Sequence, residues 1–433
     1  MSPARPIAFI NARLVDPESG YDGPGGLVAA QGVITDVRKG GNFKDLSDDL
    51  QVVDCNGAML APGLVDIRVR TGEPGAETKE TLKSAARAAA AGGVTSMVVQ
   101  PDTDPVIDDP SVVDFILRRA RDVELVHVYP AGAATKGLKG ERMAEIGLMR
   151  DAGCVYVTDS DRPIVDSKVM RRVMTYASSL GVLLAHRPAD PWLSAGAAAT
   201  EGEFAARLGL PSVPTIAERI MLERDLALAE LTGARLLADQ ITCAEGLESL
   251  RRGKDRGARV WASASINHLS FNELDIGDYR TFARLDPPLR NEDDRQALID
   301  GLADGLIDIV VSAHTPAPAE DKRLPFDEAA PGAIGLETLL PALLAFHHDE
   351  RIPLVKLIRA ATLAPARLLG LKTGRLTTGA PADLVLCDLG APLVVDADKL
   401  ISKSKNSPFD GRRLQGQVLM TLVDGRIVHR VTE

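Results

Sequence analysis

The chain has 433 residues, of which 45% are hydrophobic and 25% are charged, and its formal net charge is −10. This length allows a large hydrophobic core and favours two domains, since α/β barrels often run past about 250 residues as one unit. The acidic balance, without a long basic stripe, argues against a nucleic-acid surface, which requires clustered Lys and Arg.

The sequence shows no sign of export or membrane insertion. Residues 1–17 lack a charged start followed by an apolar core and a cleavage site, and no run of about 18 apolar residues occurs. The four cysteines are far apart, without a CxxC spacing, which is typical of reduced buried thiols. We therefore expect a cytoplasmic protein with no membrane partner.

The first sixty residues contain short apolar runs broken by Gly and Asp, at residues 7–15, 25–39 and 51–63. These alternating runs predict a small all-β segment.

From about residue 64 the pattern changes to strand-like runs that are each followed by a long helical stretch. Such pairs include residues 95–101 with 109–122, 124–130 with 140–153, 181–188 with 215–233, 234–240 with 244–257, and 307–314 with 335–348. This alternation over roughly 300 residues favours a parallel (β/α)8 barrel of the TIM type, which we place at residues 61–369.

Strands return at residues 382–390, 391–397 and 417–431. Neither end of the chain has enough strands to bury a sheet face alone, so we expect both ends to pair. The prediction is a composite β-sandwich domain of residues 1–60 plus 370–433. Residues 316–330 are predicted as a long loop at the barrel mouth, where loops after strands build active sites.

A group of motifs in order and spacing carries a resemblance. They include APGLVDIRVRTGEPG, QPDTDP, LLAHRPAD, EGEFAARLGLPSVPTIAE, RLDPPLR, VVSAHTPAPAEDK and GAPADLVLCDL. In these motifs the chain resembles the dihydroorotases of the amidohydrolase superfamily. The resemblance implies a barrel enzyme of pyrimidine synthesis that hydrolyses or closes a cyclic amide with one or two zinc ions.

The first motif departs from the family pattern at its chemical positions. Arg68 and Arg70 stand where the family has two metal-binding histidines, and Gly72 stands where it has an arginine for the substrate carboxylate. A guanidinium has five donors and no lone pair, so it cannot be a zinc ligand.

The departures continue around the barrel. One carboxylate survives at Asp159, with its register against Ser160 left open, and His186 matches a metal histidine. Gln240 replaces a further histidine, and Ala313 replaces the general base that precedes His314. The predicted vestigial site is thus Arg68, Arg70, Asp159, His186, Gln240, Ala313 and His314.

Only Asp159 and His186 remain as candidate metal ligands, fewer than the three that a catalytic zinc normally has. The sequence therefore predicts no catalytic residue and no cofactor. Residues i and i+2 of a strand share a face, so Arg68 and Arg70 are predicted to point into the barrel and to pair with Asp159, Asp161 or Asp66. Asp102 and Asp286 replace two asparagines of the family's substrate site.

The main prediction is a catalytically inactive dihydroorotase-like protein that is a structural or regulatory partner of aspartate carbamoyltransferase and forms a homo-oligomer, as the resemblance implies. Two alternatives stay open. One is an active cyclic amidase that uses zinc, suggested by the retained Asp159, His186 and His314. The other is an anion-binding module in which Arg68 and Arg70 hold a small dicarboxylate.

Overall fold

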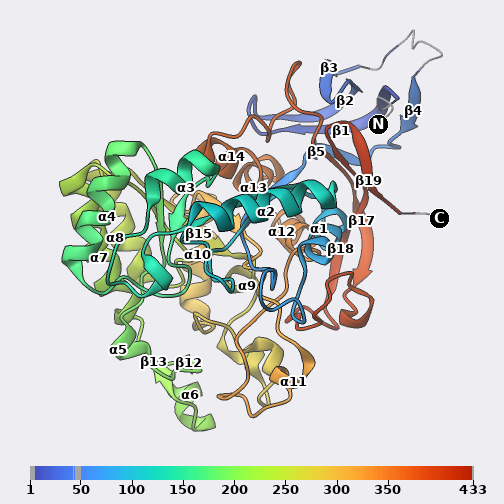
Figure 1. Ribbon diagram of the computed structural model, residues 1–433. Coiled ribbons are helices and arrows are strands. Elements are labelled where there is room, and N and C mark those ends of the chain that lie inside the picture. The colour runs from blue at the N-terminus through green and yellow to red at the C-terminus, as the bar shows by residue number, and fades with distance from the viewer. Residues whose placement is uncertain (1–4, 42, 44–49, 432–433) are drawn as a thin grey trace.

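The computed structural model describes residues 5–41, 43 and 50–431. A helix-wrapped barrel forms the larger part of the molecule, and a strand-rich unit lies at its upper right in Figure 1. In the described part of the chain, every helix is too short or too polar to span a bilayer.

Two parallel sheets make up the barrel wall. One has the order β6-β7-β8 and the other has the order β16-β15-β14-β11-β10-β9. The strands are β6 (Leu64–Val69), β7 (Val94–Val99), β8 (His127–Pro130), β9 (Gly132–Ala133), β10 (Val157–Thr158), β11 (Leu183–His186), β14 (Arg235–Ala238), β15 (Val260–Ser265) and β16 (Ile309–Val311).

The two sheets join at both of their edges. Strand β8 runs into β9 across a single residue, Ala131. At the other edge Val69 forms a parallel bridge with His314, and the Arg70 amide donates to the His314 carbonyl at 2.8 Å. The predicted TIM-type barrel fold is therefore confirmed.

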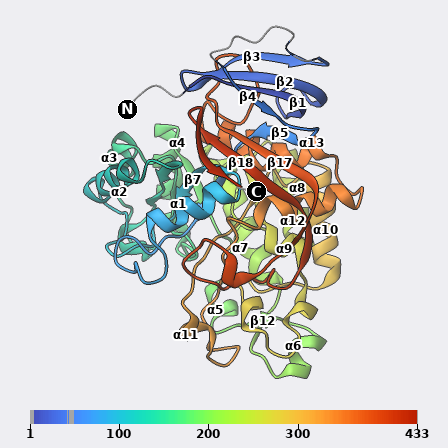
Figure 2. The same cartoon turned by 90° about the vertical axis from the view of Figure 1, so that its right-hand side faces the viewer.

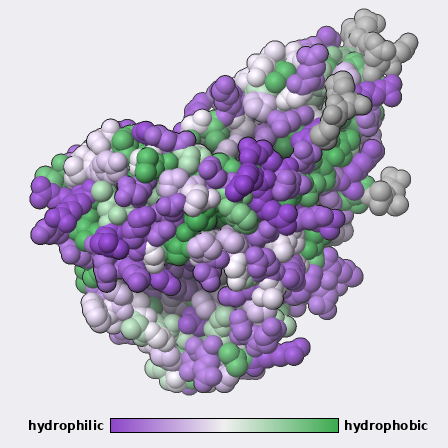
Figure 3. Space-filling view, viewed as in Figure 1, coloured by the Kyte–Doolittle hydropathy of each residue, from purple (hydrophilic) through white to green (hydrophobic). Residues whose placement is uncertain are grey.

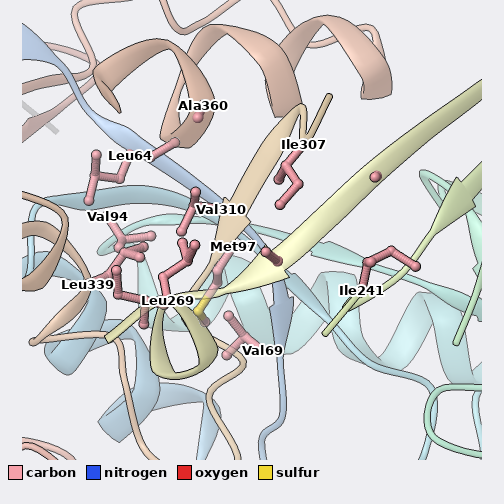
Figure 4. Packing of buried hydrophobic residues seen from close by; sticks show 14 of the residues in the cluster. Leu64, Val69, Val94, Met97, Ile241, Leu269, Ile307, Val310, Leu339 and Ala360 are labelled. Carbon is pink, nitrogen blue, oxygen red and sulfur yellow. The ribbon is translucent and has the colours of Figure 1, made fainter. Parts of the chain in front are cut away.

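Helices cover the outside of this wall. They are α1 (Leu82–Ala91), α2 (Pro110–Val123), α3 (Ile146–Ala152), α4 (Ser167–Leu180), α7 (Ile216–Thr232), α8 (Ala244–Asp255), α10 (Glu292–Ala303), α12 (Leu339–His348), α13 (Leu354–Ala361) and α14 (Leu363–Leu369). Local sequence sets their ends: Asp109 caps α2 by accepting from Ser111 N, with Pro110 at the first helical position. The cluster between strands and helices includes Leu64, Val310 and Ala360, which Figure 4 shows close together.

A second cluster gathers alternate residues of the barrel strands. Its members include Val65, Ile67, Val98, Leu183, Ala185, Leu237, Ile309 and Val311. Because side chains alternate along a strand, these positions share the inner face of the wall. The interior is therefore a packed apolar plug, above which the strand ends present polar side chains.

Strands from both ends of the chain form one sheet, as expected. Its order is β19-β18-β17-β5-β1-β2-β3, with β4 paired to β1. The strands are β1 (Ile7–Asp16), β2 (Tyr21–Ala30), β3 (Val33–Lys39), β4 (Gln51–Asp54), β5 (Met59–Pro62), β17 (Leu384–Val394), β18 (Arg413–Val423) and β19 (Arg426–Arg430). Figure 2 shows β17 and β18 running down beside the barrel helices. The exact domain boundaries stay a prediction.

Several short excursions follow the carboxyl ends of barrel strands. They are α5 (Pro191–Ser194), β12 (Ala199–Thr200), α6 (Glu203–Leu208), β13 (Ser212–Val213), α9 (Ile266–Ser270), α11 (Ala319–Lys322), and 3-10 helices at Lys136–Leu138, Glu273–Ile276 and Thr281–Ala283. A further 3-10 helix, Ala397–Lys399, follows β17 of the other sheet. Helix α11 lies inside residues 316–330, where we predicted only a loop. In Figure 1 α5, α6 and α11 lie below the barrel, so the mouth faces that way. Figure 3 shows mainly hydrophilic residues on this side of the molecule, with apolar ones in small groups.

Candidate active site at the barrel mouth

Arg68 is buried at the carboxyl end of β6 and pairs with two carboxylates. The register of β6 against β7 is irregular between Asp66 and Val69, the part of the strand that carries Arg68. The guanidinium forms ion pairs with Asp161 and Asp239. The Gln240 amide oxygen, oriented toward Arg68, accepts from its Nη2 at 2.9 Å. Such partners are what burial of a permanent charge requires.

Arg70 lies one step nearer to solvent, with 20% of its side chain exposed. Its Nε donates to Asp102 Oδ2 at 2.7 Å, and its Nη2 donates to Ser160 Oγ at 3.0 Å and to Asp161. Burial alone would lower the pKa of Arg70, but the charges of Asp102 and Asp161 raise it above its ordinary value. Arg70 therefore stays charged at every biological pH.

Asp161 is the hub of the cluster. Its carboxylate contacts Arg68 and Arg70, and it lies 3.5 Å from Nη1 of Arg187, which in turn is 3.0 Å from Asp286. Burial opposes ionisation of Asp161, yet Arg70, Arg187 and Arg68 hold its pKa well below the usual range. The mouth thus contains a network of fixed opposite charges.

The prediction that the two arginines pair with Asp159, Asp161 or Asp66 is confirmed, and the partner is Asp161. Asp159 accepts instead from the Thr135 amide at 2.8 Å and from the Thr135 hydroxyl. Asp66 accepts from the backbone amide of Arg68 at 3.2 Å. Burial raises the pKa of Asp159 above its ordinary value, and burial raises the pKa of Asp66 to about 6.

The two predicted histidines are held by neighbours. His186 Nδ1 lies 2.6 Å from Asp225 on α7, and its Nε2 accepts from the Ile164 amide at 2.9 Å. His314 Nδ1 accepts from the Gly335 amide at 3.2 Å, and its Nε2 is 3.7 Å from Glu80. Both imidazoles are buried beneath the mouth. His186 contacts the Ile164 amide and Asp225 of α7, and His314 contacts the Gly335 amide, so both have structural roles.

Three strand-end residues of the mouth have left-handed backbone: Ser160 at φ 57°, Gln240 at φ 57° and Ala313 at φ 52°. Non-glycine residues adopt this region rarely, and such positions cluster at functional sites. The chain therefore turns sharply at all three positions, although Gln240 and Ala313 replace the expected histidine and general base.

A cavity of about 390 Å³ opens beside the charge network. Its lining includes Arg70, Lys79, Asp102, Asp159, Ser160, Asp161, Arg162 and Thr315. Of the seven predicted site residues, Arg70 and Asp159 line this cavity, whereas Arg68, His186, Gln240, Ala313 and His314 do not. Cavities of this size hold small ligands.

The donor set at the mouth does not fit a divalent metal. Arg68 and Arg70 have no lone pair, both nitrogens of His186 are engaged, and Ala313 has no donor. Of the two predicted metal ligands, Asp159 and His186, only Asp159 lies on the cavity wall. No step of the chemistry below therefore uses a metal at the mouth.

Sequence reasoning missed two charged residues of the network, Arg187 and Asp239. Every second residue of their strands faces the barrel interior. Arg187 follows Leu183 and Ala185 in this pattern, and Asp239 follows Leu237. Counting side-chain alternation past the strand end would have found them, whereas motif matching drew attention to their neighbours His186 and Gln240.

Comparisons with known proteins agree with this architecture. The family model described as dihydro-orotase-like matches residues 57–246, and one described as amidohydrolase family matches residues 345–429. A protein of Desulforapulum autotrophicum named dihydroorotase is 41% identical over 424 residues, 98% of this chain and 99% of the relative. The chain belongs to the dihydroorotase family.

Other relatives extend the same picture. A dihydroorotase of Anaeromyxobacter sp. (strain K) is 39% identical over 426 residues, 98% of each chain. Among solved structures, L-hydantoinase from Arthrobacter aurescens has a TM-score of 0.87 at 24% identity, covering 99% of this chain and 96% of that chain. This structural likeness shows the shared fold.

The relatives overturn the prediction that this member of the dihydroorotase family is an inactive partner protein. Proteins named dihydroorotase are 37–41% identical over nearly the full length of the chain. That prediction rested on the side chains that the metal-binding motifs have lost. The cavity at the mouth nevertheless keeps charged residues along its wall.

The expectation that no cofactor is needed is also wrong. The family resemblance implies a metal, and His127, Asp383 and Asp424 form a group whose ligand atoms lie within 4.8 Å of one another. These three residues are far apart in sequence, so no local motif could indicate the group.

Proposed function

We propose that this chain is a cyclic amide hydrolase of the dihydroorotase type, acting at the barrel mouth. The observation that carries the proposal is the 41% identity to a named dihydroorotase over 98% of the chain. The reaction adds water across the ring amide: the C–N bond breaks, a C–O bond forms, and the ring nitrogen gains a proton. The reverse reaction closes carbamoyl aspartate to dihydroorotate.

The cavity wall has three cations beside three carboxylates, and its cations suit such a substrate. Lys79 and Arg162 line the cavity and supply cations for the carboxylate of dihydroorotate. Arg70 also lines it, and its guanidinium is fixed by Asp102 and Asp161 before a substrate arrives. A preorganised cation of this kind stabilises the negative charge that develops on the amide oxygen during attack by water.

Asp159 is the carboxylate proposed to accept the proton of the attacking water. It lines the cavity, and its pKa is raised by burial, which makes it a stronger base than an ordinary aspartate. The Thr135 amide and hydroxyl hold its two oxygens in place. Asp161 lies beside it, but three arginines hold the pKa of that carboxyl down, which makes Asp161 a weak base.

The test is an assay of the pure full-length protein with dihydroorotate and, separately, with carbamoyl aspartate, with and without added zinc. We expect turnover above buffer, and a loss of about 100-fold or more in kcat for Asp159→Asn, the range of general-base removal. Asp151→Asn, on the exposed surface of α3, is the matched control and should keep the full rate. Absence of turnover in both directions by folded protein would contradict the proposal.

A further inference from the structure

A second cluster of metal-ligating side chains lies at the opposite end of the barrel from the mouth. His127 begins β8, Asp383 directly precedes β17, and Asp424 lies in the turn between β18 and β19. The cluster therefore joins the amino-terminal end of a barrel strand to the sheet made by the carboxyl-terminal strands. It has no part in the chemistry proposed above.

The geometry of the cluster matches a small coordination site. His127 Nε2 is 3.3 Å from Asp383 Oδ1 and 3.7 Å from Asp424 Oδ1. In a tetrahedral zinc site with ligand distances of about 2.0–2.1 Å, neighbouring ligand atoms lie roughly 3.3 Å apart. One imidazole and two carboxylates are ligands that zinc accepts, and three protein ligands leave a position for water.

The supporting contacts hold the ligands together. The Asp383 side chain is 1% exposed, and its Oδ1 accepts from the Asp424 backbone amide at 2.9 Å. His127 lies at the start of a strand, Asp383 directly precedes a strand and Asp424 lies in the turn between two strands, so the three atoms need little rearrangement to meet a cation. Such preorganisation lowers the cost of binding.

Access and charge also favour a cation. A hollow of about 400 Å³ is lined by His127, Tyr129, Asp424 and Arg426 among others, and the Asp424 side chain is 48% exposed. With a neutral imidazole the three ligands carry two negative charges. Arg426 offsets one of them, so a site whose imidazole has released its proton to bind a metal keeps a net negative charge.

We propose that His127, Asp383 and Asp424 bind one divalent cation of the zinc type and thereby fasten β8 to the carboxyl-terminal strands. The role is structural, because the cluster lies at the end of the barrel away from the cavity that holds Asp159 and Arg70. This binding would persist even if the chain hydrolysed no cyclic amide.

The experiment is a zinc titration by calorimetry on full-length protein that has been stripped with a chelator and desalted. We expect one zinc ion per chain and a thermal unfolding midpoint that rises with zinc, because a cation that binds only the folded state stabilises it. His127→Ala and Asp424→Asn should each weaken binding by at least about tenfold. The control His347→Ala, outside the cluster, should bind as the parent does.

Zinc binding that is lost in both cluster variants and kept in Asp159→Asn would support the proposed site. It would also exclude the barrel mouth as the place where zinc binds. Zinc affinity unchanged in His127→Ala, or no zinc bound by the parent protein, would overturn the proposal. Asp424 is partly exposed, so its variant tests the idea even if the His127 variant fails to fold.

Discussion

Asp161 shows how single residues fix the charges of the mouth. One carboxylate forms ion pairs with Arg68, Arg70 and Arg187, and among the residues that the structure describes no second carboxylate pairs with all three. We expect Asp161→Asn to lower the free energy of unfolding by about 3–5 kcal/mol, the usual cost of breaking a buried ion pair. Urea titration of the variant measures this, with Asp151→Asn as the exposed control. A change below about 1 kcal/mol would contradict the pairing.

The same carboxyl gives a pH dependence. Its pKa is lower in the folded protein than in the unfolded chain, so the unfolded chain binds more protons at acid pH. The stability that Asp161 contributes is therefore complete above the unfolded pKa and is lost as pH falls through the lowered folded value. Urea unfolding midpoints should be measured between about pH 6 and about pH 3, a window that includes the ordinary aspartate pKa of about 3.9. They should fall more steeply for the parent than for Asp161→Asn. Parallel curves would count against the assignment.

At the scale of elements, the alternation of β11, β14 and β16 builds the plug under the mouth. Leu237 is 1% exposed within the interior cluster. We expect Leu237→Ala to cost about 2–5 kcal/mol, because the lost contacts leave a cavity that neighbouring strands cannot fill. Leu231→Ala, at a position 67% exposed on α7, should cost little. Comparable losses in the two variants would show that Leu237 does not support the barrel interior.

Much of the strand–helix order could be predicted because five of the barrel strands are apolar runs that a helical stretch follows, whereas β10 and β15 were not among the predicted pairs. The pairing of both chain ends followed from their small number of strands. Helix α11 was missed, since its four residues, Ala319–Lys322, carry no periodic apolar signal.

The site was harder to predict than the fold. The burial of Arg68 and its contact with Asp161 could be anticipated from strand alternation and the cost of burying charge. Asp239 and Arg187 could have been found by continuing the alternation of their strands, whereas the His127 cluster joins segments almost 300 residues apart. Such contacts depend on tertiary geometry, which a single sequence with no local motif does not specify.

At the scale of the whole molecule, the two ends of the barrel have different chemistry. The mouth presents a cavity with fixed cations and a basic carboxylate, while the opposite end carries a His–Asp–Asp group against the carboxyl-terminal strands. Association with aspartate carbamoyltransferase and self-association both stay predictions, and co-purification with the transferase at micromolar concentration tests the first.

The most direct measurement is approach to equilibrium from both sides. Two samples of pure protein start with dihydroorotate alone or with carbamoyl aspartate alone, and their compositions are followed beside buffer blanks. A cyclic amide hydrolase accelerates both directions, so the two samples should converge on one ratio well before the blanks change. Samples that stay apart at the rate of the blanks, with folded protein and zinc supplied, would contradict the proposed function.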